Sequence, residues 1–274
     1  MQTHSRPSFT RKLAFRLLGF LSLSFVCSLA WAQSPTGLDI MKKQRDLHKT
    51  KDEEETQQMT LVNKNGETKQ RKLTRATITS PEDLSKILIR FKAPRDVENT
   101  SLLTWEATDG NDDQWLYLPD MKKTTRIASS GKKNRFMGTD FSYEDLRPEN
   151  LSLHVYNLLA SETVDGQDCF VIEALPATEK EAAAGGYSKR KLWLRKDTYY
   201  TVKREFFDKK DQLEKVQTDR KLVNVKGSIW RADEIEMRDV QAGTKTLVVI
   251  EVRAQDKGLK ESLFTAAALE RGGR

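Results

Sequence analysis

The chain has 274 residues and a formal net charge of +7, with 47 basic and 40 acidic side chains. Four of the excess positive charges lie in the first 32 residues, which contain no acidic side chain. The remainder has a nearly balanced charge and no polybasic block, so the composition gives no support to a nucleic-acid partner.

The N-terminal segment has the pattern of a secretory signal peptide. Basic residues precede an apolar run from Leu17 to Leu29, and Ala30-Trp31-Ala32 follows with the small-x-small pattern of a cleavage site. The run is shorter than the roughly 20 apolar residues that a membrane-spanning helix needs. Val26 precedes Cys27, where a lipid-attachment site requires a small residue. We therefore expect a signal peptide at residues 1–32, cleaved after Ala32, and no lipid attachment.

An amphipathic helix is predicted over residues 37–49, where an apolar stripe runs among basic residues. The acidic residues Glu53, Glu54 and Glu55 are interpreted as a solvated helix end rather than as paired catalytic carboxylates. From about Gln57 the pattern changes to alternating segments, and Asn65-Gly66 is a strong hairpin signal. Strands are expected at 59–62, 68–79, 86–92, 101–107 and 114–118.

The strand at 114–118 is apolar on both faces. Trp115 and Tyr117 point to one side, and Leu116 and Leu118 point to the other. Such a strand needs two partners to bury against. Further along, Thr139 or Asp140 can cap a short helix predicted over residues 140–147.

The second half of the chain reads almost entirely as strands. A hairpin is expected around Asp165-Gly166, and a flexible loop at 182–186. Cys169, the only cysteine after the signal, is expected to pack as a small apolar residue. The expected strands span 152–164, 168–175, 188–194, 199–208, 212–225, 229–239 and 244–254, and a final helix spans 259–269. About eleven strands and three helices fit either a sandwich or an incomplete barrel.

Residues that would carry catalysis or bind a metal are scarce. His48, His154 and Cys169 are widely separated in sequence, which argues against a zinc or iron site. The chain contains no nucleophile elbow, phosphate loop or dinucleotide motif. The Asp109 to Asp113 segment has calcium-loop spacing, but Gln114 stands where that loop needs glycine, so a polar turn is favoured. We therefore expect no catalytic residues, metal or cofactor.

Two segments carry a resemblance to a known family. They are Asp113 to Pro119, DQWLYLP, which Lys123 and Arg126-Ile127 follow, and Phe136 to Leu146, FMGTDFSYEDL. Together with the closing Leu263-Phe264-Thr265 and Leu269-Glu270-Arg271, they resemble the LolA-like outer-membrane lipoprotein-sorting family of Gram-negative periplasmic proteins. The resemblance covers nearly the whole chain after the signal.

The resemblance implies one mainly antiparallel α+β domain over residues 33–274, an unclosed half β-barrel whose concave apolar face is covered by short helices. It also implies a periplasmic, non-enzymatic protein that holds acyl chains of a lipid or lipoprotein. An acyl chain needs such shielding because each buried methylene is worth about 0.8 kcal/mol. The residues expected to line the cavity, rather than to fill an ordinary core, are Trp105, Trp115, Tyr117, Phe136, Met137, Phe141 and Tyr143.

Three functions remain open at this point. The first is a monomeric carrier that moves a hydrophobic ligand towards the outer membrane. Because several relatives accompany RND-type (MMPL-like) exporters, an inner-membrane transporter and an outer-membrane acceptor would be its partners. The second is a sensor that binds another envelope protein, and the third is an envelope scaffold with a filled interior.

Overall fold

The structure, a computed structural model, describes residues 1–4, 34–108 and 112–271. The chain divides into the units Met1–Ser34 and Pro35–Arg274, and the second contains all the helices and strands of these ranges. The expected signal peptide and its cleavage site lie almost entirely outside the described residues. In the described ranges, no helix is long and apolar enough to span a bilayer.

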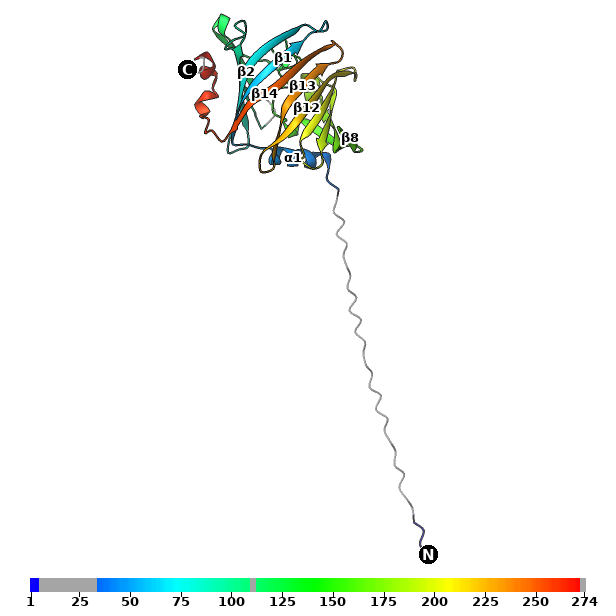
Figure 1. The fold of residues 1–274 in the computed structure, drawn as a ribbon. Coiled ribbons are helices and arrows are strands. Elements are labelled where there is room, and N and C mark those ends of the chain that lie inside the picture. The colour runs from blue at the N-terminus through cyan, green and yellow to red at the C-terminus, as the bar shows by residue number, and fades with distance from the viewer. Residues whose placement is uncertain (5–33, 109–111, 272–274) are drawn as a thin grey trace. The chain divides into compact units, whose positions relative to one another are not determined.

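The strands of the second unit form one antiparallel sheet of 14 strands (Figure 1). Its order is β6-β5-β4-β3-β2-β1-β14-β13-β12-β11-β10-β9-β7, and β8 pairs with β9 outside this path. The strands are β1 (Asp52–Val62), β2 (Thr68–Thr79), β3 (Ser85–Ala93), β4 (Ser101–Trp105), β5 (Asp113–Leu118), β6 (Lys123–Arg126), β7 (His154–Leu158), β8 (Glu162–Val164), β9 (Gln167–Pro176), β10 (Lys189–Arg195), β11 (Thr201–Phe207), β12 (Leu213–Lys226), β13 (Ile229–Asp239) and β14 (Thr244–Gln255).

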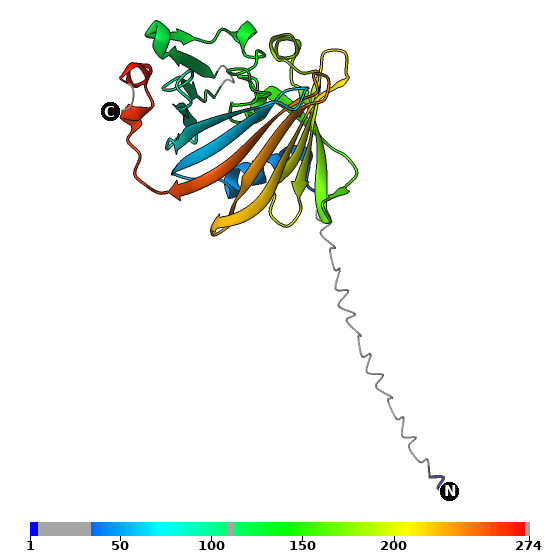
Figure 2. The same cartoon turned by 45° about the horizontal axis from the view of Figure 1, so that its top comes forward.

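The sheet is curved but not closed, because β6 and β7 at its ends do not pair with each other (Figure 2). Most neighbours are consecutive in the chain, and the exceptions are the central pair of β1 with β14 and the pair of β7 with β9 at one end. The expected half-barrel is confirmed. The sheet has more strands than the eleven or so expected, because β6 was not predicted and the segment expected at 152–164 divides into β7 and β8.

Three short α-helices accompany the sheet: α1 (Gly37–Leu47), α2 (Glu179–Ala184) and α3 (Ala266–Glu270). Thr36 and Asp39 form a capping box at the start of α1, which satisfies backbone donors there. The buried Ile40 and Met41 of α1 pack against Ala174 of β9 and its neighbours on β10. Four single turns of 3-10 helix complete the secondary structure: Pro119–Met121, Ser129–Gly131, Leu151–Leu153 and Glu261–Leu263.

The helix predicted over residues 140–147 is absent, and that prediction is wrong. Met137 and Gly138 both have positive φ, and the Thr139 amide donates to the carbonyl of Phe136 at 2.9 Å. This tight turn reverses the chain, so that the Phe136 amide bonds to the carbonyl of Phe141 at 2.8 Å. The side chain of Asp140 serves tertiary contacts instead of capping a helix. The loop expected at 182–186 begins within α2.

The acidic segment before Gln57 is also not a helix end. Strand β1 already starts at Asp52, and Glu53 and Glu55 are buried at 3% and 6% exposure. The pairing of β1 between β2 and β14 explains this burial, because inward positions of a central strand lie under the rest of the fold.

The two-sided strand β5 has two apolar partners, as its pattern requires. Leu116 packs against the large core on the concave side of the sheet. Trp115 and Tyr117 pack in a second cluster with Phe264 and Leu269 from the C-terminal segment. Cys169, expected to be a packed residue, is fully buried, and burial raises the pKa of its thiol.

Candidate ligand-binding cavity

A cavity of about 660 Å³ lies over the concave face of the sheet. This volume is within the range of small-molecule binding sites. Inward-facing side chains of β1, β2, β3 and β9 to β14 form its floor and walls. Helix α1 and residues 127–150, which we call the covering segment, supply much of the remaining lining, and α2 and several loops complete it.

One part of the cavity, which we call the apolar end, is built from aliphatic and aromatic side chains. Met59 of β1, Leu73 of β2 and Val248 of β14 lie on adjacent strands and belong to the main core cluster. The covering segment adds Phe136 and Phe141 to the same cluster. Further lining residues of this end are Ile89, Leu146, Phe206 and Ile235.

The other part, which we call the charged end, begins only a few residues away on the same strands. Glu55 of β1 stands opposite Arg75 of β2 on one side and Arg253 of β14 on the other. Arg253 Nε donates to Glu55 Oε1 at 2.7 Å, and Gln57 Nε2 donates to Glu55 Oε2 at 2.6 Å. Both oxygens of the Glu55 carboxylate are therefore occupied.

A second buried carboxylate, Glu53, lies next along β1. Arg231 of β13 donates through Nε to both of its oxygens, at 3.0 and 3.1 Å, and Gln255 Nε2 donates at 2.7 Å. Burial acts to raise the pKa of Glu53, but the charge of Arg231 and these hydrogen bonds outweigh burial and hold the pKa below its usual value. Glu53 is thus an ionised wall group rather than a proton donor.

Asp219 of β12 behaves differently. It is 6% exposed, and burial raises its pKa above the ordinary value. Arg204 of β11 lowers the pKa but does not offset burial, because its Nη1 lies 3.5 Å from Asp219 Oδ2.

Helix α1 closes the charged end. Arg45 Nη2 donates to Glu106 Oε1 at 2.9 Å, and Gln44 Nε2 donates to Thr201 Oγ1 at 2.7 Å. His48 follows the helix and accepts from the Trp230 amide at 3.2 Å. Burial and the nearby Arg231 lower the pKa of His48, so its ring is neutral near pH 7. Side-chain bonds therefore tie the helix and its C-terminal residue to β11, β13 and the segment after β4.

A third polar cluster lies where β7 and β10 meet the covering segment. Arg190 donates to both oxygens of Glu149 at 2.9 Å and contacts the ring of His154. Burial acts to raise the pKa of Glu149, but Arg190 brings it down to about 2. Burial, followed by the charge of Arg190, lowers the pKa of His154 to about 4. His154 is therefore a neutral packing partner of an ion pair.

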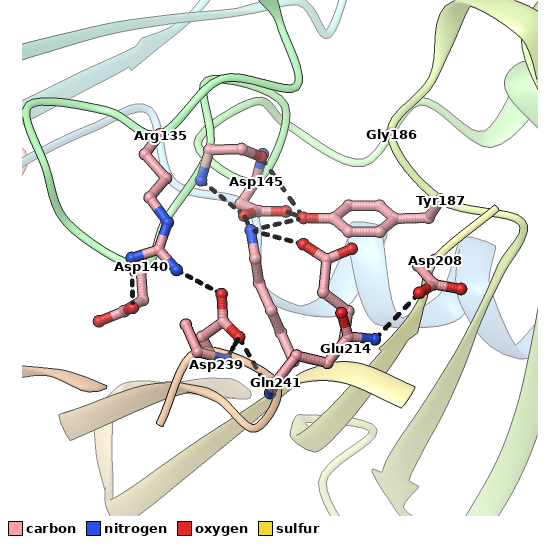
Figure 3. Close-up of polar contacts among 12 residues, drawn as sticks. Arg135, Asp140, Asp145, Gly186, Tyr187, Asp208, Glu214, Asp239 and Gln241 are labelled. Atoms are coloured by element: carbon pink, nitrogen blue, oxygen red, sulfur yellow. Dashed lines mark hydrogen bonds and ion pairs between the residues drawn. The ribbon is translucent and has the colours of Figure 1, made fainter. Parts of the chain in front are cut away.

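The covering segment is held in place by two sets of buried polar contacts (Figure 3). In the first, Arg135 Nη1 donates to Asp140 Oδ1 at 3.0 Å, and Arg135 also pairs with Asp239. Thr246 Oγ1 of β14 donates to Asp140 Oδ2 at 2.7 Å. These contacts fix the turn that carries Phe136 and Phe141 to the end of β13 and the start of β14.

The second set surrounds Asp145. Its carboxylate lies 3.4 Å from Lys215 Nζ, and the two side chains are only 1% and 3% exposed. Tyr187 Oη donates to Asp145 at 2.8 Å, and the Ser142 amide donates at 2.7 Å (Figure 3). An ion pair this deeply buried is costly to break from one side, so it fixes the covering segment over the apolar end.

Of the seven residues expected to line the cavity, only Phe136 and Phe141 do so. Tyr143 is buried and packs edge-on against Phe136 at 5.6 Å, and Met137 is half-buried beside the same core. The other three, Trp105, Trp115 and Tyr117, lie in the cluster under α3, where Trp105 Nε1 donates to the carbonyl of Phe264 at 2.8 Å. Their alternation predicted burial but could not specify which face of the sheet borders the cavity.

The sequence reasoning missed the charged end. A signal was present, since Glu53, Glu55, Gln57 and Met59 follow the period of two that marks one face of a strand. Three successive acidic residues obscured it. Their arginine partners lie far along the chain, on β13 and β14.

Among the described residues, no group of three or more His, Cys, Asp and Glu side chains could hold a metal ion. Asp113, part of the calcium-like segment, accepts from Arg126 Nε at 2.7 Å, while Asp109 and Asn111 lie outside the described residues.

The open antiparallel sheet around an internal cavity defines an unclosed half-barrel, and solved structures share it. An outer membrane lipoprotein-sorting protein domain from Vibrio parahaemolyticus is 34% identical, with a TM-score of 0.81, and the match covers 86% of this chain and 98% of that one. A DUF1329 family protein from Desulfovibrio piger is 28% identical, with a TM-score of 0.79 and coverage of 85% and 97%. A LolA superfamily protein from Nitrosomonas europaea shares the fold at 16% identity, with a TM-score of 0.66 and coverage of 85% and 98%.

The family model that matches residues 83–271 carries the description "Uncharacterized protein". No curated protein matches the chain. On the similarity to the Vibrio domain over nearly its full length, the chain belongs to the LolA-like outer-membrane lipoprotein-sorting family.

Proposed function

We propose that this protein is a periplasmic carrier that holds the acyl chain of a lipidated protein, or of another hydrophobic ligand, in its cavity for transfer towards the outer membrane. The observation that carries the proposal is the apolar end of the cavity, enclosed between the sheet and the covering segment. Membership of a family with an outer membrane lipoprotein-sorting domain supports the same role.

The physical argument rests on shielding. Each methylene that leaves water is worth about 0.8 kcal/mol, so an acyl chain crosses the periplasm only inside an apolar enclosure. Met59, Leu73 and Val248 would contact such a chain from the sheet, and Phe136 and Phe141 would contact it from above. The role needs no catalytic step. It needs a donor at the inner membrane, for which an RND/MMPL-type exporter is our candidate, and an acceptor at the outer membrane.

The first test is chemical. Protein purified from its native envelope without detergent should yield acyl-containing lipid when it is extracted and analysed by mass spectrometry. Purified protein should also bind a fluorescent fatty-acid probe, and Val248→Trp should weaken this binding at least about tenfold because the indole fills the apolar end.

Val252→Trp is the matched control, because Val252 lies on the same strand but is 60% exposed. It should bind the probe as the wild type does, and thermal unfolding should confirm that both variants are folded. The carrier proposal fails if native protein repeatedly holds no lipid and the wild type binds no probe. Equal binding by the wild type and a folded Val248→Trp variant would place the acyl site elsewhere.

A further inference from the structure

The charged end of the cavity contains more positive than negative side chains. Strands β1, β2 and β11 to β14 contribute four arginines to the lining, against three carboxylates. The arginines are Arg75, Arg204, Arg231 and Arg253, and the carboxylates are Glu53, Glu55 and Asp219. Arg231 and Arg253 are occupied by the two glutamates, by Asp233 and by backbone carbonyls, and Arg204 pairs with Asp219, so Arg75 decides what this end can bind.

Arg75 makes no hydrogen bond or close ion pair among the described residues, and its charge acts on the nearby Glu53, whose pKa it helps to lower. Its cross-strand neighbour Glu55 does not serve it, since Arg253 and Gln57 occupy the two carboxylate oxygens of Glu55. The Arg75 side chain is half-buried on the cavity wall. A guanidinium with five donors is thus available inside the cavity.

One further donor near this end lacks a partner. The hydroxyl of Thr77, two residues after Arg75 on the same face of β2, is buried without a hydrogen bond. Nη1 of Arg204 also makes no hydrogen bond, but it forms an ion pair with Asp219 Oδ2 at 3.5 Å. Leaving a buried polar group unsatisfied costs about 1–3 kcal/mol, so a ligand that supplies acceptor oxygens here gains binding energy.

The apolar end begins directly beside these donors. Leu73 and Arg75 face the cavity from the same strand, two residues apart, which separates them by roughly 7 Å along the strand. A ligand with an acyl chain over Leu73, Met59 and Val248 would therefore place its polar head at Arg75.

We propose that the charged end is a subsite for the anionic headgroup, carboxylate or phosphate, of a single-chain amphiphile, with Arg75 and Thr77 as its principal donors. The inference rests on the proposed carrier function and specifies the class of cargo. Arg204 on β11, which β1 and β12 to β14 separate from β2, adds a second cation to the same cavity. A cationic head would find the carboxylates of Glu53 and Glu55 already neutralised by arginine.

The test compares three amphiphiles with the same palmitoyl chain: palmitate, palmitoyl lysophosphatidic acid and neutral monopalmitoylglycerol. Each displaces a fluorescent fatty-acid probe from full-length mature protein at concentrations below its micelle formation. The wild type should bind at least one anionic ligand about tenfold more tightly than the neutral one. The difference between palmitate and the phosphate ligand identifies which headgroup the subsite prefers.

Arg75→Gln should abolish this preference without weakening the binding of monopalmitoylglycerol, and Arg75→Lys should retain part of it. Lys72→Gln is the matched control, because it removes one positive charge from the same strand at a side chain that is 46% exposed. It should keep the wild-type preference. Thermal unfolding of each variant verifies the fold.

Two results would overturn the subsite while leaving the carrier function intact. One is equal affinity of the wild type for all three ligands, and the other is an equal loss for all three in a folded Arg75→Gln variant. Failure of the wild type to bind any of the three ligands or the fluorescent probe would instead overturn the carrier proposal, and the subsite with it.

Discussion

The apolar and charged ends of the cavity use the same strands and the same alternation of inward positions. On β1 the inward side chain changes from Glu55 to Met59 within four residues, and on β2 it changes from Arg75 to Leu73 within two. The sheet geometry therefore provides one surface, and the residue identities divide it into two environments. An amphiphilic interior of this kind differs from the wholly apolar face that the family resemblance implied.

The two ends also differ in how they are covered. The covering segment lies over the apolar end and is fixed by buried charges, above all Asp145 with Lys215. Helix α1 closes the charged end through contacts such as that of Arg45 with Glu106. Buried ion pairs therefore stabilise the covering segment at the apolar end, whereas at the charged end they stabilise the cavity wall itself.

The largest expected effect is at the cover of the apolar end. Asp145→Ala should lower the free energy of unfolding by about 5 kcal/mol, because Lys215 stays buried without its partner and two further donors lose an acceptor. Chemical denaturation measures this loss. Asp197→Ala removes an aspartate that pairs with Arg195 at 55% exposure, and should cost at most about 1 kcal/mol. Similar losses in the two variants would show that the covering segment is not held by this pair.

A smaller effect is expected at the wall of the charged end. Glu53→Ala leaves Arg231 without its carboxylate and should lower the free energy of unfolding by about 3 kcal/mol, since Arg231 keeps backbone partners at the carbonyls of Trp230 and His48. The midpoint temperature of thermal unfolding should fall by about 10 °C. Glu261→Ala, which removes the 71% exposed partner of Lys86, is the control. A loss no greater than in the control would indicate that the charged end is as well hydrated as the surface.

The smallest effect concerns pH. The pKa of His154 is lowered from 6.5 to about 4 in the fold, so the unfolded chain binds more protons than the folded one between these values. Stability should therefore decrease as pH falls below 6.5, by about 2 kcal/mol at pH 5. Glu149, whose pKa is lowered from 4.5 to about 2, adds its loss only below pH 4.5.

His154→Gln should flatten the part of this profile between pH 6.5 and 5. Denaturant titrations of the wild type and the variant at several pH values measure the slope. An unchanged slope in the His154 variant would mean that His154 is protonated in the folded protein.

Local signals in the sequence predicted most of the sheet. Strand β13 spans Ile229–Asp239 as expected, because Lys226-Gly227 and Ala242-Gly243 bound β13 and the start of β14. The prediction of a helix over 140–147 was wrong because the Asp140 carboxylate accepts a hydrogen bond from Thr246, 106 residues away, instead of capping its own backbone. The charged end depends on similar distances, since Glu53 and Glu55 pair with residues 178 and 198 positions later. The pattern of a short stretch of sequence cannot reveal partners at such separations.

The central pairing of β1 with β14 constrains the order in which the protein can fold. The register joins Glu53 to Gln255 and Val62 to Lys245, so the middle of the sheet forms only when the first and last strands of the described sheet have paired. Contacts of this sequence separation form slowly, because a long loop must close before they contribute. Until then the carboxylates of β1 have no arginines and the cavity has no floor, so the binding site and the folded state come into existence together.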